Sequence, residues 1–124
     1  MKLIASEADV QKAVLDWVNT LPGVTLWRHN VGAREYLKAN GKRGIVRFGQ
    51  PGEADLMGIC HGRFLAIEVK KPGEYPTALQ QKWLLWVRSY GAIALWVDSL
   101  DSCVGQLRRE YEGHCWTWRK NWEP

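Results

Sequence analysis

The chain has 124 residues, enough to bury one hydrophobic core and too few for two, so we predict a single domain over residues 1–124. Hydrophobic residues make up 46% and charged residues 24%, as in ordinary globular proteins, and no apolar run reaches the roughly 18 residues that a membrane span needs. The formal net charge of +4 favours an anionic partner but is common among proteins that have none.

The N-terminal segment turns polar at Ser6 before a signal peptide could form, which predicts an intracellular, cytoplasmic protein. Ser6 is also a plausible N-cap. From Val10 to Leu21 apolar residues recur at steps of three and four, so we predict an amphipathic helix over residues 7–20 that ends before Pro22. Glu7 falls on the buried face of its first turn.

A basic segment follows the first predicted strand, residues 24–31. It holds six Lys and Arg residues against the single acid Glu35 and is interspersed with glycines. We expect a loop that contacts phosphates, although a merely solvated basic loop would have the same composition. The basic residues are Arg28, Arg34, Lys38, Lys42, Arg43 and Arg47.

Strands and helices alternate in the rest of the chain. Further strands are predicted over residues 44–48, 54–60 and 64–69, with the last two paired as a hairpin. A helix over residues 77–90, capped by Thr77, precedes a buried and parallel strand over residues 92–97. A weaker helix over residues 99–110 and an edge strand over residues 115–119 follow. The predicted order is helix, about three strands, helix, strand, helix, an α/β arrangement.

The predicted strand over residues 64–70 carries the clearest chemical signal. Side chains alternate faces along a strand, so Glu68 and Lys70 share one face. A salt-bridged pair on a surface strand gives the same pattern, but apolar flanks indicate a buried strand. Asp55 opens the preceding strand, and hairpin pairing would bring it beside Glu68. Two carboxylates this close repel one another, and a hard cation such as Mg²⁺ relieves the repulsion.

These residues resemble a known family, the PD-(D/E)XK nucleases. The fuller pattern, over roughly residues 6–98, is similar to the virus-type replication-repair nuclease (VRR-NUC) branch. The segments that carry the resemblance are Arg28-His29-Asn30-Val31-Gly32, Gly52-Glu53-Ala54-Asp55, Ile67-Glu68-Val69-Lys70 and the spacing Thr77, Gln80, Trp83. Ala54 stands where the family's name has proline.

The resemblance implies a restriction-endonuclease-like core, which is a central mixed β-sheet flanked by helices. It also implies an endonuclease that depends on Mg²⁺ or Mn²⁺ and hydrolyses DNA phosphodiester bonds, as a homodimer, on structured DNA such as Holliday junctions. Such stand-alone domains are typical of bacteria and phages. The alternative is a catalytically inactive nucleic-acid-binding module that keeps the fold. No nucleotide cofactor is expected, because Gly41-Lys42 lacks the rest of a P-loop.

Site roles follow from the resemblance, position by position. Asp55 and Glu68 would bind the metal together with the main-chain carbonyl of Val69, and Lys70 would be the catalytic base or a charge stabiliser. Glu7 would be a supporting ligand, and Gln80 would contact the site from the following helix, with Gln81 as the alternative. DNA contacts are expected from Arg28, Asn30, Arg34, Lys42, Arg43 and Arg47.

Tryptophan and cysteine take structural roles in this reading. We expect Trp17, Trp83, Trp86 and Trp96 to pack in the core, whereas Trp116, Trp118 and Trp122 fit either a dimer interface or burial beneath the last helix. Three cysteines without a C-x-x-C pair indicate buried free thiols.

Overall fold

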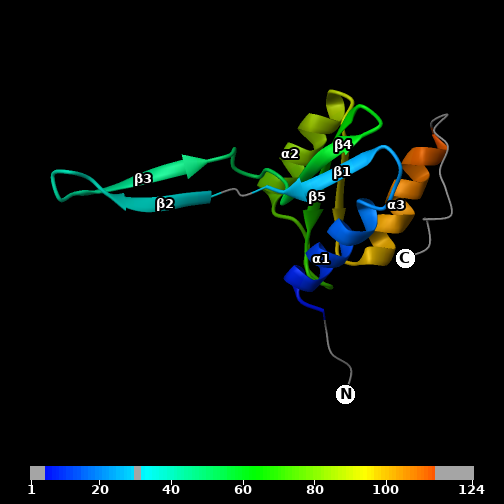
Figure 1. Cartoon of the computed structure of the whole chain (residues 1–124), viewed down its shortest axis with the longest axis horizontal. Coiled ribbons are helices and arrows are strands. Elements are labelled where there is room, and N and C mark those ends of the chain that lie inside the picture. Colours follow the sequence, from blue (N-terminus) through cyan, green and yellow to red (C-terminus); the bar gives the residue numbers. More distant parts are fainter. Residues whose placement is uncertain (1–4, 30–31, 114–124) are drawn as a thin grey trace, which may run out of the picture.

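The computed structural model describes residues 5–29 and 32–113, with backbone alone for residues 32–34 and 46–48. The fold is α/β, as predicted (Figure 1). The elements in chain order are α1 (Glu7–Val18), β1 (Val24–Arg28), β2 (Gly32–Leu37), β3 (Arg43–Phe48), β4 (Leu56–Cys60), β5 (Arg63–Val69), α2 (Ala78–Ser89), β6 (Ile93–Val97) and α3 (Leu100–Glu112).

The central sheet has four strands in the order β1-β4-β5-β6. It is mixed, because β1, β4 and β5 pair antiparallel whereas β6 joins β5 in parallel. The predicted hairpin of β4 and β5 and the predicted parallel β6 are both confirmed. The connections explain these directions. The tight turn at His61 and Gly62 joins β4 to β5 as antiparallel neighbours, whereas the parallel pair β5 and β6 needs the crossover helix α2.

Two apolar layers hold the helices to this sheet. Helices α1 and α3 cover one face, where Leu65, Ile67 and Val69 of β5 are fully buried. Helix α2 covers the other face through Trp83 and Leu84, which pack in one cluster with small side chains of the sheet. Alternation along β5 therefore directs Ala66 and Glu68 towards α2. No helix within residues 5–29 and 32–113 is long and apolar enough to span a membrane.

The helix ends follow the local rules that the sequence indicated. Ser6 caps α1 and Thr77 caps α2, and in both cases the hydroxyl accepts a hydrogen bond from the third residue of the helix. Of the four tryptophans expected in the core, Trp17 and Trp83 are buried and Trp96 is half-buried. The expectation for Trp86 is wrong, since this side chain is 51% exposed on the outer side of α2.

Most of the basic segment is not a loop, which corrects that prediction, whereas the strand predicted over residues 44–48 is confirmed as part of β3. Strands β2 and β3 pair antiparallel in a two-stranded sheet of their own, which projects from the rest of the molecule (Figure 1). Five strands therefore precede α2 rather than about three. The sequence did contain a signal, because Asn40-Gly41 is a strong hairpin-turn dipeptide and Gly41 has a φ of 83°. The strands lack the polar and apolar alternation of a half-buried sheet because no second layer covers them.

Candidate active site

Asp55 and Glu68 come together because β4 and β5 pair in register. Leu56 lies opposite Ile67, which places Asp55 opposite Glu68. The amide of Asp55 donates to Glu68 Oε2 (3.2 Å), and the amide of Val69 donates to Asp55 Oδ2 (3.4 Å). Each carboxylate is thus held by the main chain beside the other, and the predicted convergence of the two acids is confirmed.

Glu68 is the one polar or charged side chain buried in the described part of the chain, with 1% of its surface exposed. Burial, followed by the negative charge of Asp55, raises the pKa of Glu68 to about 8 from its ordinary value of 4.5. The nearby ammonium of Lys70 acts in the opposite direction but is outweighed. The site therefore lacks positive charge when only these protein groups are present.

Lys70 follows β5 directly and lies on the same side of the sheet as Glu68. Its Nζ is 3.7 Å from Glu68 Oε1, and 14% of its side chain is exposed. The amide of Lys70 donates to the carbonyl of Val97 (2.9 Å), so β6 fixes the backbone at this point. The ammonium is consequently held at the rim of the carboxylate pair, where a ligand from solvent can reach it.

Gln80 reaches the site from the first turn of α2, as its spacing predicted. Its Nε2 donates to Glu68 Oε1 (3.0 Å), whereas Gln81 donates instead to the carbonyl of Pro76 (3.0 Å). Gln80 can reach Glu68 because the turn before Asp55 lies close to the start of α2. Gly52 has a φ of 86°, and a Cβ there would stand 2.7 Å from the main-chain oxygen of Leu79. Only glycine allows this turn to lie against the start of α2.

An ion pair that sequence reasoning did not find lies beside the carboxylates. His29 Nε2 pairs with Glu53 Oε2, and the amide of His29 donates to the carbonyl of Asp55 (2.7 Å). His29 follows β1 and Glu53 precedes β4, so the pair joins the two ends of the segment that contains the β2–β3 hairpin. The residues are far apart in sequence, and no spacing rule connects them.

Glu7 does not join Asp55 and Glu68. It is half-buried in the first turn of α1, and α1 packs on the sheet face opposite to Glu68. Across residues 5–29 and 32–113, no three or more His, Cys, Asp or Glu side chains are grouped to hold a metal ion. A role for Glu7 as a metal ligand, directly or through water, stays a prediction.

The two carboxylates nevertheless fit Mg²⁺ or Mn²⁺. The donor set consists of hard oxygen atoms, and Mg²⁺ commonly keeps several waters and binds through only one or two carboxylates. The raised pKa of Glu68 reports an unbalanced pair of negative groups, which a divalent cation would balance. Asp55 and Glu68, with the main-chain carbonyl of Val69, are the residues that would hold it.

The expected DNA contacts divide into two groups. Arg28 is exposed at the end of β1, close to the site, whereas Lys42 and Arg43 are exposed at the far end of the hairpin. Arg34 and Arg47 lie in β2 and β3. Asn30 lies outside the described residues, as do the predicted edge strand 115–119 and Trp116, Trp118 and Trp122.

A scan against protein-family models finds no match for the chain, and a search of curated proteins finds no similar sequence. No function can therefore be transferred to this chain from these two comparisons.

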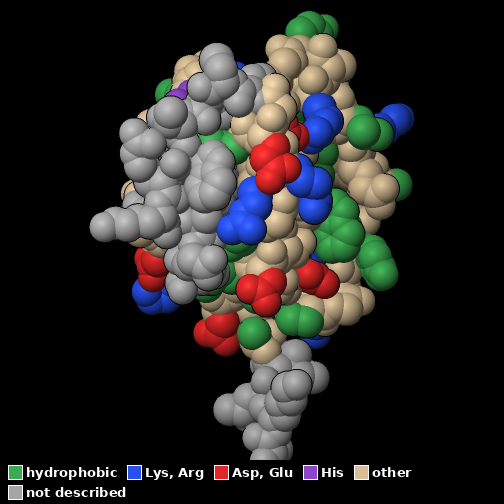
Figure 2. Space-filling model, turned by 90° about the vertical axis from the view of Figure 1, so that its right-hand side faces the viewer, with side chains coloured by type: hydrophobic (Ala, Val, Ile, Leu, Met, Phe, Trp, Pro, Cys, Tyr) green, Lys and Arg blue, Asp and Glu red, His purple; other side chains and the backbone are tan. Residues whose placement is uncertain are grey.

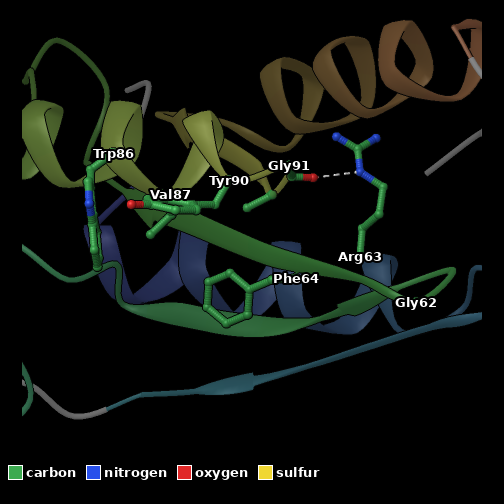
Figure 3. Close-up of a pocket in the computed structure, with 8 residues that line it drawn as sticks. Gly62, Arg63, Phe64, Trp86, Val87, Tyr90 and Gly91 are labelled. Carbon is green, nitrogen blue, oxygen red and sulfur yellow. Dashed lines mark hydrogen bonds between the residues drawn. The ribbon is translucent and has the colours of Figure 1, made fainter.

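A separate hollow lies at the Arg63 end of β5 (Figure 3). It encloses about 550 Å³ between Phe64 and the side chains of Trp86 and Tyr90 from the end of α2. Arg63 Nε donates to the carbonyl of Gly91 (2.9 Å) at its border. Its lining contains no carboxylate, histidine or thiol, so it lacks the usual side-chain ligands of a metal ion.

The two cysteines among the described residues are both buried. Cys60 and Cys103 are buried free thiols, as predicted, and Cys115 lies outside the described residues. Burial raises the pKa of Cys103 to about 12, which keeps it in the unreactive thiol form.

Proposed function

We propose that this chain is a metal-dependent DNA endonuclease with a restriction-endonuclease-like core. The observation that carries the proposal is the buried pair of Asp55 and Glu68, with Lys70 at its rim and Gln80 bonded to it from α2. A buried acid pair costs folding free energy, so its presence in a well-packed core points to chemistry. The mixed sheet and flanking helices agree with the fold that the resemblance implies.

The residues divide the work by charge. When bound, Mg²⁺ or Mn²⁺ would polarise the phosphodiester and lower the pKa of a bound water. Lys70 orients the attacking water and stabilises the negative charge that develops on the phosphate. Gln80 and the amide of Asp55 hold the Glu68 carboxylate in one orientation, and the amide of Val69 does the same for Asp55.

Structured DNA is the proposed substrate class, with four-way junctions first among the candidates. A homodimer would present two sites and cut two strands. The substrate class and the homodimer are both proposed from the resemblance. The cleavage assay tests the substrate class directly.

The test is cleavage of labelled four-way junction, flap, nicked, duplex and single-stranded DNA, with Mg²⁺ or Mn²⁺ and with EDTA. We expect cutting by the wild type that needs metal, and a loss of at least about 100-fold in Lys70→Ala. The matched control is Lys71→Ala, since the adjacent Lys71 is exposed and pairs only with Glu74 among the described residues. This variant should cut normally.

Two outcomes would overturn the proposal. Equal cutting by Lys70→Ala and the wild type would remove Lys70 from the chemistry. Binding of DNA without cleavage under either metal would instead favour an inactive nucleic-acid-binding module.

A further inference from the structure

The β2–β3 hairpin stands apart from the core as an arm, which we define as residues 32–48. Its two strands pair only with one another, in a separate sheet. Figure 1 shows the arm projecting well beyond the four-stranded sheet and its helices. None of its residues belongs to either hydrophobic cluster of the described core. The described side chains of the arm therefore take no part in the two clusters that pack the core.

The net charge of the protein resides on this arm. The arm contains five Lys and Arg residues and one acid, whereas the rest of the chain contains twelve basic and twelve acidic residues. Its acid, Glu35, is already paired with Arg43 (2.8 Å). Figure 2 shows the side of the molecule away from the arm, where Lys and Arg side chains lie among Asp and Glu. The positive excess of the sequence is thus concentrated in the arm.

Exposed apolar side chains accompany the charges. Leu37 is 74% exposed and Ile45 is 58% exposed, although both lie in strands. Tyr36 is 45% exposed and lies across Gly44, where a Cβ would stand 2.5 Å from the Tyr36 ring. A two-stranded sheet without a covering layer is only marginally stable in water. These side chains thus lack a partner within the described chain.

The root of the arm meets the catalytic groups. The His29–Glu53 pair joins the chain entering the arm to the chain leaving it, and His29 is bonded to the backbone of Asp55. A molecule held along the arm is therefore tethered to the part of the chain that carries Asp55.

We propose that the arm is a DNA-binding ribbon that lies in the major groove of the duplex flanking the cleavage site, a statement that rests on the proposed function. A two-stranded ribbon fits the width of the major groove, where apolar side chains contact thymine methyl groups. Lys38, Lys42 and Arg43 meet the phosphates on either side of the groove. The arm extends the contact with duplex DNA away from the site and sets where the strand is cut.

The first experiment measures DNA binding in EDTA, so that cleavage plays no part. The arm variant Lys38→Gln/Lys42→Gln is compared with Lys12→Gln/Arg109→Gln, which removes the same charge from exposed positions on α1 and α3. The probe is a duplex of about three helical turns, titrated between about 50 and 200 mM salt. We expect the arm variant to bind at least about tenfold more weakly, with a salt slope smaller by about 1.8. The control variant should match the wild type.

The second experiment shortens the arm. Replacing residues 36–44 by Asn-Gly joins Glu35 to Ile45, which are directly paired, through a two-residue turn. The removed part is roughly 13 Å long at about 3.3 Å per residue, so the footprint on the duplex should shrink by about four base pairs on one side of the cut.

The outcomes separate this proposal from the proposed function. Equal binding by the arm and control variants, or an unchanged footprint after shortening, would overturn the arm proposal even if the protein cuts DNA. Failure of the wild type to bind duplex DNA would overturn it as well. Binding that depends on the arm, without cleavage under any metal, would support the arm and overturn the nuclease.

Discussion

Glu68 is the residue on which the chemistry of the site depends. Its carboxylate is almost fully buried and accepts from the main-chain amide of Asp55 and from Gln80 Nε2, with the ammonium of Lys70 nearby. These partners do not balance burial and the adjacent charge of Asp55, and the pKa stays raised to about 8. In the absence of a cation, the raised pKa means that the folded protein holds the Glu68 proton more tightly than the unfolded chain does.

This raised pKa predicts a loss of stability with increasing pH in the metal-free protein. The folded state binds the Glu68 proton more tightly than the unfolded state, whose pKa is near 4.5. The stabilising contribution is therefore complete below about pH 4.5 and is lost as the pH rises towards 8. The limiting slope for one proton is about 1.4 kcal/mol per pH unit. Thermal unfolding in EDTA between pH 5 and pH 8 measures it, with Glu68→Gln as the variant that should lack this contribution.

Added Mg²⁺ supplies the control for that measurement. At pH 8 the cation should raise the Tm of the wild type and leave Glu68→Gln less affected, since the cation replaces the proton between the carboxylates. Identical pH slopes in the two proteins would show that Glu68 does not carry the linkage.

At the scale of elements, the start of α2 joins helix stability to the site. Gln80 Oε1 accepts from the amide of Thr77 (2.8 Å) in a capping box, while Gln80 Nε2 donates to Glu68. The Gln80 side chain thus caps the start of α2 and also orients the Glu68 carboxylate. The turn at Gly52 packs on the backbone of the same helix, so α2 and β4 are fixed relative to one another.

Two substitutions separate these roles. Thr77→Ala removes the cap and should lower the free energy of unfolding by about 1 kcal/mol while cleavage continues. Gln80→Glu keeps the cap, because glutamate also accepts from the amide of residue 77, but it replaces the donor to Glu68 by a negative charge. We expect it to lower the cleavage rate by about tenfold or more with little change in helix content, measured by circular dichroism. Equal effects of both variants on cleavage would mean that Gln80 acts only as a cap.

The elements predicted from sequence are those with a local signal. Alternation along β5 predicted that Glu68 and Lys70 share a face, and the caps of Ser6 and Thr77 predicted two helix starts. The strand over residues 44–48 was predicted, but its partner β2 was predicted as part of a loop, because an uncovered hairpin has no buried face to impose alternation. Trp86 was expected in the core because it is apolar and one helical turn after Trp83, but α2 buries only Trp83 and Leu84 among its described residues. The His29–Glu53 contact forms only through pairing of β1 with β4, which no local pattern encodes.

The whole molecule consists of a packed core and an uncovered arm. The core holds both hydrophobic clusters and the site, with charges of both signs, and the arm holds the excess positive charge. Figure 1 shows the arm to one side of the core, away from α1, α2 and α3. The His29–Glu53 pair and the bond from His29 to the backbone of Asp55 lie on the core side of the junction between the two.

This division predicts that the core folds without the arm. The shortened protein, with residues 36–44 replaced by Asn-Gly, keeps every residue of both clusters and of the carboxylate site. Its Tm should lie within about 4 °C of the wild type, which corresponds to roughly 1 kcal/mol in a domain of this size. Because repulsion among like charges on the arm is also removed, a slight rise at low salt is expected. A fall of more than about 8 °C, measured by calorimetry at equal salt, would show that the arm packs on the core and is part of its cooperative unit.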